Sequence, residues 1–185
     1  TDNALSTLPA GYFNSLALYL DAAGDVIVYL GTKQGLYALD YANAKFIETG
    51  LSGNAMPFHD YACRGALWWR DAFYVSSGLA IYQYLAGSPG DVSLVGPDRD
   101  YGLPAAYRGN IVKLLGDNNA LYALIDATVA DSQDLYPAGL YGDVQIYSNV
   151  GYSAILKWDT KGWSVVYLSG VAATPLVAGV VATAD

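Results

Sequence analysis

The sequence has little of what several large classes of protein need. It contains one cysteine, Cys63, so no disulfide can form within the chain, and a disulfide-framed secreted module is excluded. We expect this lone thiol to be buried. Basic residues number 9 against 17 acidic ones and are scattered singly, which gives a net charge of -8. No basic stripe is available for a phosphate backbone, so we expect no nucleic-acid partner.

Long apolar runs are also lacking. The longest, residues 171–184, is shorter than the roughly 20 residues that a membrane-spanning helix needs, and it contains Pro175 and Gly179. We therefore interpret it as strand and expect no membrane insertion. Charged residues make up only 14% of the chain and hydrophobic residues 54%. This composition is that of a chain that folds, because disordered segments are poor in hydrophobic residues and rich in charge.

What the sequence does contain points to β-structure. It has 17 tyrosines and 20 glycines, which suit strands joined by tight turns. The apolar residues alternate with a period close to two, and no stretch keeps a helical spacing across three turns without Gly or Pro. The sequence therefore predicts an all-β fold of antiparallel strands.

The predicted strands fall into sets of four with hairpin connections. The first set is 16–20, 26–30, 35–40 and 45–49; the second is 66–70, 73–76, 79–84 and 92–95; the third is 111–115, 121–126, 153–158 and 163–168. Third strands begin at Gly35 and Gly78, a step of 43 residues. This step is typical of the four-stranded blades of a β-propeller.

On this reading the whole chain, 1–185, is one β-propeller-like segment of about three blades and a fragment. The blades are 13–50, 62–96 and 108–170, the last interrupted by an insertion at 128–150, and 171–185 begins a further blade. A twisted sheet with two apolar faces can bury both only by stacking against its neighbours. Since closure needs at least about four blades, the rest of a ring must come from a longer parent chain or from other subunits. A different architecture, such as a sandwich or barrel, is the alternative.

The tryptophans give two further predictions. Trp68 and Trp69 are consecutive on a strand, so one should face each side of the sheet, and both should be buried. Trp158 and Trp163 flank the turn 159–162 and should pair across that hairpin.

Two motifs carry a resemblance to known repeats. The run Val28-Tyr-Leu-Gly-Thr-Lys-Gln-Gly-Leu-Tyr37 resembles the blade core of sensor-type propellers. The run Val95-Gly-Pro-Asp-Arg-Asp-Tyr-Gly-Leu-Pro104, with Tyr107-Arg-Gly-Asn-Ile-Val112, is similar to propeller repeats in minor structural and tail proteins of tailed bacteriophages. This resemblance implies a virion component that touches the host envelope, and it implies no catalytic residue.

His59 is the single histidine, and Asp60 follows it in a loop before the second blade. Neighbouring side chains on an extended segment point apart, so the two cannot by themselves form a catalytic triad. We predict a loop histidine bonded to backbone; a general base, or a place in a binding site together with Asp60, is the alternative.

Asp98 and Asp100 lie at alternate positions of a Gly-Pro-rich loop, as oxygen ligands of calcium can. Arg99 between them argues against a cation, and no third carboxylate follows at a binding-loop spacing. We predict no cofactor and no metal, with Asp98 as a turn residue and Asp100 paired with Arg99 or Arg108. Calcium at Asp98 and Asp100 is the alternative.

Three tyrosines of the insertion, Tyr136, Tyr141 and Tyr147, are candidates for binding a partner. Each offers a rigid apolar ring with a hydroxyl at its edge, suited to a sugar or to a protein surface. The alternative is that they pack the insertion onto the blades.

These features predict a non-enzymatic structural and binding protein, located in a virion or outside the cell. Its partners would be other subunits or the remaining blades of a longer chain, and a glycan or protein of a host surface. A fragment of a secreted carbohydrate-active or sensor propeller is the alternative, although the segment offers no convincing pair of carboxylates for sugar cleavage.

Overall fold

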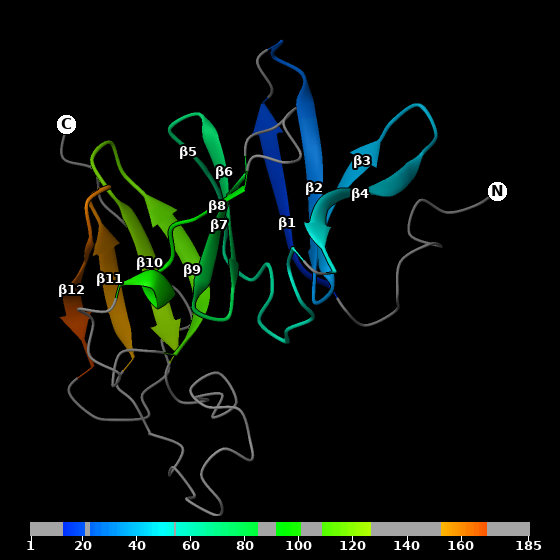
Figure 1. Cartoon of the computed structure of the whole chain (residues 1–185). Coiled ribbons are helices and arrows are strands. Elements are labelled where there is room, and N and C mark those ends of the chain that lie inside the picture. Colours follow the sequence, from blue (N-terminus) through cyan, green and yellow to red (C-terminus); the bar gives the residue numbers. More distant parts are fainter. Residues whose placement is uncertain are drawn as a thin grey trace, which may run out of the picture.

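The prediction of an all-β fold is confirmed by the computed structural model, which describes residues 13–20, 23–53, 55–84, 92–100, 109–126 and 153–169. In this part of the chain, twelve strands form three antiparallel four-stranded sheets. Each sheet consists of four strands consecutive in the sequence, and the three stand side by side in a row (Figure 1). The arrangement is consistent with successive blades of a β-propeller.

Sheet A contains β1 (Phe13–Leu20), β2 (Val26–Thr32), β3 (Gly35–Asp40) and β4 (Lys45–Ser52). Sheet B contains β5 (Ala66–Trp69), β6 (Ala72–Ser77), β7 (Ala80–Tyr84) and β8 (Val92–Leu94). The short 3-10 helix η1 (Pro97–Arg99) lies between sheets B and C in the sequence. Sheet C contains β9 (Asn110–Gly116), β10 (Leu121–Asp126), β11 (Ala154–Trp158) and β12 (Trp163–Leu168).

Turn chemistry explains where many of the strands end. Asp40, Asp117 and Asp159 each close a hairpin with the same device, in which Oδ1 accepts the backbone N–H groups two and three residues ahead. Such Asx turns satisfy backbone donors that the ladder leaves unpaired. Gly24 and Gly78 occupy turn positions with φ of 86° and 58°, a conformation that glycine adopts without strain.

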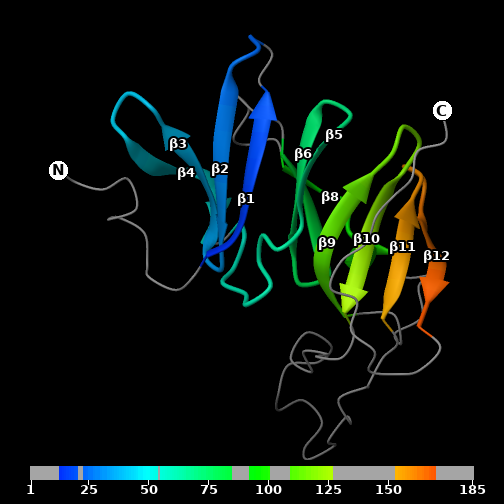
Figure 2. The ribbon, with the colours of Figure 1, turned by 180° about the vertical axis from the view of Figure 1, so that it is seen from behind.

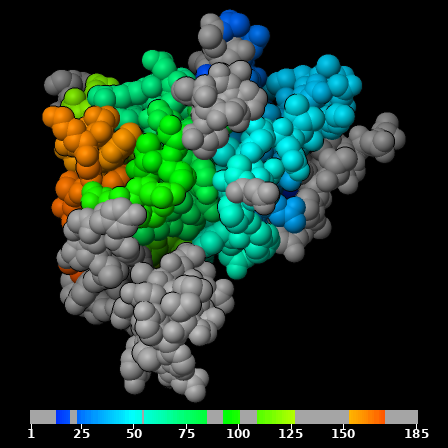
Figure 3. All heavy atoms as spheres, in the orientation of Figure 1, coloured from blue at the N-terminus to red at the C-terminus, as the bar shows by residue number. Residues whose placement is uncertain are grey.

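The middle sheet is buried on both faces because its side chains alternate. On β6, Phe73 and Val75 belong to the core between sheets A and B, whereas Tyr74 belongs to the core between sheets B and C. Seen from behind, sheet B again lies between the other two (Figure 2). The surface of the three sheets is continuous (Figure 3). The chain therefore buries apolar surface by stacking one sheet on the next.

The predicted division of Trp68 and Trp69 between the two faces is confirmed. The ring of Trp68 lies 4.3 Å from that of Tyr19 in sheet A, and the ring of Trp69 lies 6.1 Å from that of Trp158 in sheet C. Trp69 is buried and Trp68 half-buried, so full burial of both was wrong for Trp68. The predicted pairing of Trp158 with Trp163 is confirmed, since the two are cross-strand neighbours with stacked rings.

The twelve predicted strands are present, with small differences at their ends. Residues 70 and 79 fall in turns rather than in strands, and Arg70 has a φ of 46°, a turn conformation. The predicted insertion 128–150 and the predicted further blade 171–185 lie outside the described residues.

Candidate functional site

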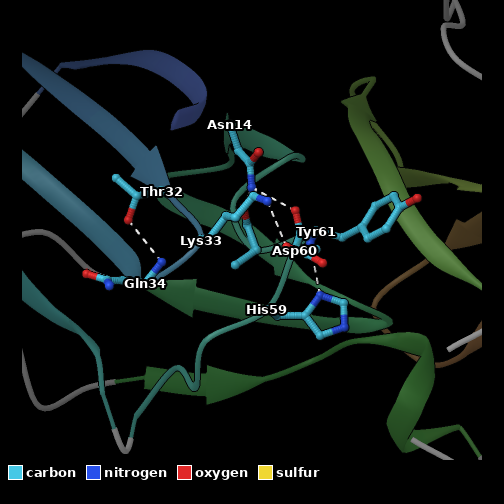
Figure 4. A network of polar contacts seen from close by, with 8 residues as sticks. Asn14, Thr32, Lys33, Gln34, His59, Asp60 and Tyr61 are labelled. Atoms are coloured by element: carbon cyan, nitrogen blue, oxygen red, sulfur yellow. Dashed lines mark hydrogen bonds and ion pairs between the residues drawn. The ribbon is translucent and has the colours of Figure 1, made fainter. Parts of the chain in front are cut away.

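His59 and Asp60 lie in the segment that joins sheet A to sheet B. This segment runs past the turn between β2 and β3, where the backbone N–H of His59 donates to the carbonyl oxygen of Lys33 at 3.0 Å. The N–H of Ala62 then donates to the oxygen of His59 at 3.0 Å and closes a tight turn. The two candidate residues are thus held at one end of sheet A by backbone contacts (Figure 4).

The imidazole of His59 faces the backbone of this turn. Its Nδ1 accepts the N–H of Tyr61 at 3.0 Å, so in the neutral ring the proton is on Nε2 (Figure 4). A catalytic His–Asp dyad needs the opposite arrangement, with Nδ1–H donating to the carboxylate. The contact to Tyr61 is the backbone bond that the sequence predicts for this histidine.

The carboxylate of Asp60 is paired with Lys33. The Nζ to Oδ1 distance is 2.7 Å, and this hydrogen bond together with the positive charge lowers the pKa of Asp60 from its ordinary value. Asn14 of β1 binds the backbone of the same turn: its Nδ2 donates to the oxygen of Asp60 at 3.1 Å and to that of Ala62 at 2.6 Å. These contacts from β1 and from the β2–β3 turn hold the segment in place.

Beneath this turn lies Cys63, which is fully buried as expected. Its Sγ is 3.7 Å from Sδ of Met56, and its backbone N–H donates to Ser76 of β6 at 2.6 Å. Burial raises the pKa of the Cys63 thiol to about 12. A thiol that remains protonated is a poor nucleophile, so the chemistry of Cys63 is that of a small core residue.

Asp98 and Asp100 lie at the second connection, between sheets B and C. Oδ2 of Asp98 is 3.4 Å from Nε of Arg99. Oδ2 of Asp100 accepts the backbone N–H of Trp163 in sheet C at 2.9 Å. Arg108, the other predicted partner of Asp100, lies outside the described residues.

The described contacts of the two aspartates are those of a connector between sheets. In the part of the chain covered by the structure, no three His, Cys, Asp or Glu side chains come together as a metal site requires. A calcium ion at Asp98 and Asp100 would need further ligands from elsewhere.

The three candidate tyrosines of the insertion, Tyr136, Tyr141 and Tyr147, lie outside the described residues, so their role stays a prediction. The sequence did not single out Asn14, Lys33 or the contact between Asp100 and Trp163. Asn14 is 46 residues away from Asp60, and Asp100 is 63 away from Trp163. Local sequence patterns do not indicate contacts between residues that are this far apart in the sequence.

No protein-family model matches the chain, and no curated protein matches it at a significant level. No helix in the described ranges has the length and apolar character needed to cross a membrane.

Proposed function

We propose that this chain is a non-enzymatic structural and binding protein, a virion component of the tail or minor structural class. The stacked sheets provide a rigid platform, and the insertion at 128–150, with Tyr136, Tyr141 and Tyr147, contacts a receptor or glycan of the host surface. The phage association is supported by the resemblance of the runs 95–104 and 107–112 to propeller repeats of phage structural proteins.

The observation that carries the platform role is the burial of sheet B on both faces. Phe73 and Val75 are fully buried toward sheet A, and Ile81 is fully buried toward sheet C. Close-packed interfaces of this kind resist deformation, because a shift of one sheet would open voids against its neighbours. A rigid support is what a receptor-contacting loop needs in order to be presented in one orientation.

The polar contacts support a structural role rather than catalysis. His59 accepts a backbone N–H, Asp60 is paired with Lys33, and Asp100 holds the N–H of Trp163. Each of these side chains stabilises a connection between neighbouring sheets. A site for chemistry would instead direct such groups together into one cavity.

The test uses the native chain from its source culture. We expect immunogold labelling with an antibody against the chain to decorate phage particles, and the purified chain to bind host envelopes but to leave fluorogenic glycosides intact. Tyr136→Ala, Tyr141→Ala and Tyr147→Ala together should abolish envelope binding. The matched control Tyr41→Ala, in the β3–β4 turn, should bind like the wild type. Unlabelled particles, or steady hydrolysis of glycosides by the pure chain, would contradict the proposal.

A further inference from the structure

Each sheet has an inner edge at its first strand and an outer edge at its fourth strand. The first strands lie toward one another, since β1 contacts β5 and β5 contacts β9. The fourth strands, β4, β8 and β12, lie at the opposite end of the strand order, and each has one edge without a neighbour among the described strands. Such an edge presents backbone N–H and C=O groups with which another strand can pair.

Two of the outer edges have features that keep other chains from pairing with them. β8 consists of three residues and therefore offers only a short edge. β4 carries Lys45 and Glu48, and both side chains are exposed. Short edge strands and charged side chains are common means by which proteins protect the edge of a sheet.

The outer edge of sheet C, formed by β12, has neither of these features. β12 is six residues long and contains no charged residue, proline or glycine. In both ribbon views it is the outermost strand of sheet C (Figures 1 and 2). A bulge at Val166 does not set it apart, because the register of β4 also shifts. Its exposed apolar side chains are Val165, Val166, Tyr167 and Leu168, and Val166 is exposed by 57%.

The two ends of β12 are already bonded within the chain. The backbone N–H of Trp163 donates to Oδ2 of Asp100 at 2.9 Å. Just beyond the strand, the N–H of Ser169 donates to the carbonyl oxygen of Ser153 at 2.9 Å. The part of this edge that can receive another strand is therefore 164–168.

The charges on the hairpin that forms this edge are balanced. The hairpin β11–β12 carries Lys157, Asp159 and Lys161, and Asp100 is bound to its second strand. Positive and negative charges therefore cancel there, although the whole chain has a net charge of -8. Two copies can approach at this edge without local repulsion. Antiparallel pairing of two β4 strands about their middle would instead bring the Glu48 side chains of both copies together, which is unfavourable.

We propose that two copies of this chain pair through β12, antiparallel and about a two-fold axis, so that their C sheets join into one continuous sheet. An antiparallel edge is complementary to itself, because the two-fold axis brings N–H groups of each copy opposite C=O groups of the other. A single open edge is thus sufficient for the contact, and the uncharged side chains of 164–168 bring no like charges face to face. This inference goes beyond the proposed function and does not depend on a role in a virion.

The first experiment measures the mass of the full chain by sedimentation equilibrium across a wide range of concentrations. We expect the mass to rise from 19.6 kDa in dilute solution to that of a dimer in concentrated solution. The dimer should be reversible, because one strand from each copy makes a smaller contact than most stable interfaces. The mass should not rise further, since the pairing uses the open edge of both copies.

The second experiment places a charge at the middle of the edge. In Val166→Lys and in Val166→Glu, like charges would lie on both sides of the two-fold axis, so each variant alone should stay monomeric. An equal mixture of the two should form dimers again, because the charges are then opposite. The matched control is Ile47→Lys on β4, whose side chain is 44% exposed, and it should dimerise like the wild type. Far-UV circular dichroism checks that each variant is folded.

The third experiment follows the backbone of the edge directly and needs no variant. Amide hydrogen exchange within 164–168 should slow as the wild-type concentration rises, because strand pairing bonds N–H groups that are otherwise open to water. Exchange within 45–48 of β4 should not depend on concentration. If the charged variants of Val166 fail to fold, this measurement alone decides.

Three results would overturn the proposal. The first is a wild type that stays monomeric at every concentration. The second is a dimer that persists in both Val166→Lys and Val166→Glu, which would place the contact on another surface. The third is full protection of the amides in 164–168 in the dilute monomer, which would show that the chain itself covers this edge.

Discussion

The indole Nε1–H of Trp163 donates a hydrogen bond to the backbone oxygen of Val95 at 2.8 Å. The two residues are 68 positions apart, and the bond ties β12 of sheet C to the segment that leaves sheet B. The backbone N–H of Trp163 is bound to Asp100 of the same segment. Trp163 therefore links sheet C to the segment that leaves sheet B by two hydrogen bonds, and its ring stacks on that of Trp158.

Replacing this tryptophan tests how much the hydrogen bond of its indole contributes to stability. Trp163→Phe keeps an aromatic ring to stack on Trp158 but removes the donor to Val95, and it should lower the free energy of unfolding by about 1 kcal/mol. Urea denaturation followed by circular dichroism measures the change. Tyr41→Phe, which removes a hydroxyl from an exposed turn residue, should change the stability little. Equal stability of Trp163→Phe and wild type would show that the bond contributes nothing.

Asn14 should contribute at least as much to the stability of the segment that joins sheet A to sheet B. Its side-chain amide holds two carbonyl oxygens of the turn that contains Asp60 and Ala62, and Asn14→Ala would leave both without this donor. We expect a loss of about 1 to 2 kcal/mol and faster hydrogen exchange of the amides in 59–65. Lys33→Met is the matched control, because its ion pair with Asp60 is exposed to solvent and such pairs contribute little. If the two variants lose equal stability, the amide of Asn14 has no special role.

The three Asx turns predict a loss of stability in acid. Hydrogen bonds to the carboxylates lower the pKa of Asp40, Asp117 and Asp159 below the ordinary value of 3.8, the largest effects being those of the Asn43 side chain, the Asn119 N–H and the Lys161 N–H. A lowered folded-state pKa gives stabilisation that is present above the unfolded-state pKa and disappears as the pH falls through the folded-state pKa.

The variant that tests this carries asparagine at all three positions. Asparagine keeps an oxygen that can accept the turn N–H groups but does not titrate, so stability should fall less steeply below the ordinary pKa than in the wild type. The measurement is the midpoint of urea unfolding as a function of pH. Asp71→Asn, in the β5–β6 turn, is the control for loss of a negative charge at a hairpin. An unchanged slope in the triple variant would rule out the turns as the cause.

Gly31 marks a close approach between sheet A and the connecting segment. A Cβ at this position would overlap Oγ of Ser15 and Cβ of Cys63. Gly31→Ala should therefore destabilise the fold by about 1 to 3 kcal/mol, as overpacking of a dense interior does. Gly162→Ala is the matched control, since a Cβ there would meet its nearest neighbour, Oδ2 of Asp100, at an ordinary 3.7 Å. In thermal unfolding, Gly31→Ala should have a clearly lower melting temperature than Gly162→Ala. Similar melting temperatures would contradict the close packing around Gly31.

Cys63 should be unreactive while the chain is folded. Burial raises the pKa of its thiol to about 12, so near neutral pH almost no thiolate is present, and the solvent has no access to the sulfur. We expect iodoacetamide to modify it only as fast as the protein unfolds, and rapidly in denaturant. Fast alkylation under native conditions would mean that the segment around Cys63 opens readily.

The fold could be predicted from the sequence because its signals are local. Alternating residues such as Phe73, Tyr74 and Val75 mark a strand with two buried faces, and the aspartates that follow strands mark hairpins. The identical runs 36–39 and 121–124 lie on the third strand of one sheet and the second strand of another. Four identical residues thus do not by themselves specify the position of a strand within its sheet, whereas the order of strands and turns along the chain does.

The contacts around the candidate residues could be predicted only in part. The backbone bond of His59 is local, and it follows from the tendency of a loop histidine to accept a nearby N–H. The contacts made by Asn14 and Trp163 depend on which sheets stack, and they become visible only when residues far apart in the sequence are placed in space.

Within the described residues, each sheet is assembled from four strands that follow one another in the sequence, and none of these twelve strands is exchanged between sheets. A ribosome delivering the chain from its N-terminus would release every sheet as a finished set of hairpins before the next begins, so pairing could keep pace with synthesis. The same segmentation gives evolution a simple route to change: copying or deleting one set of hairpins alters the length of the row without altering the register of any strand in the rest.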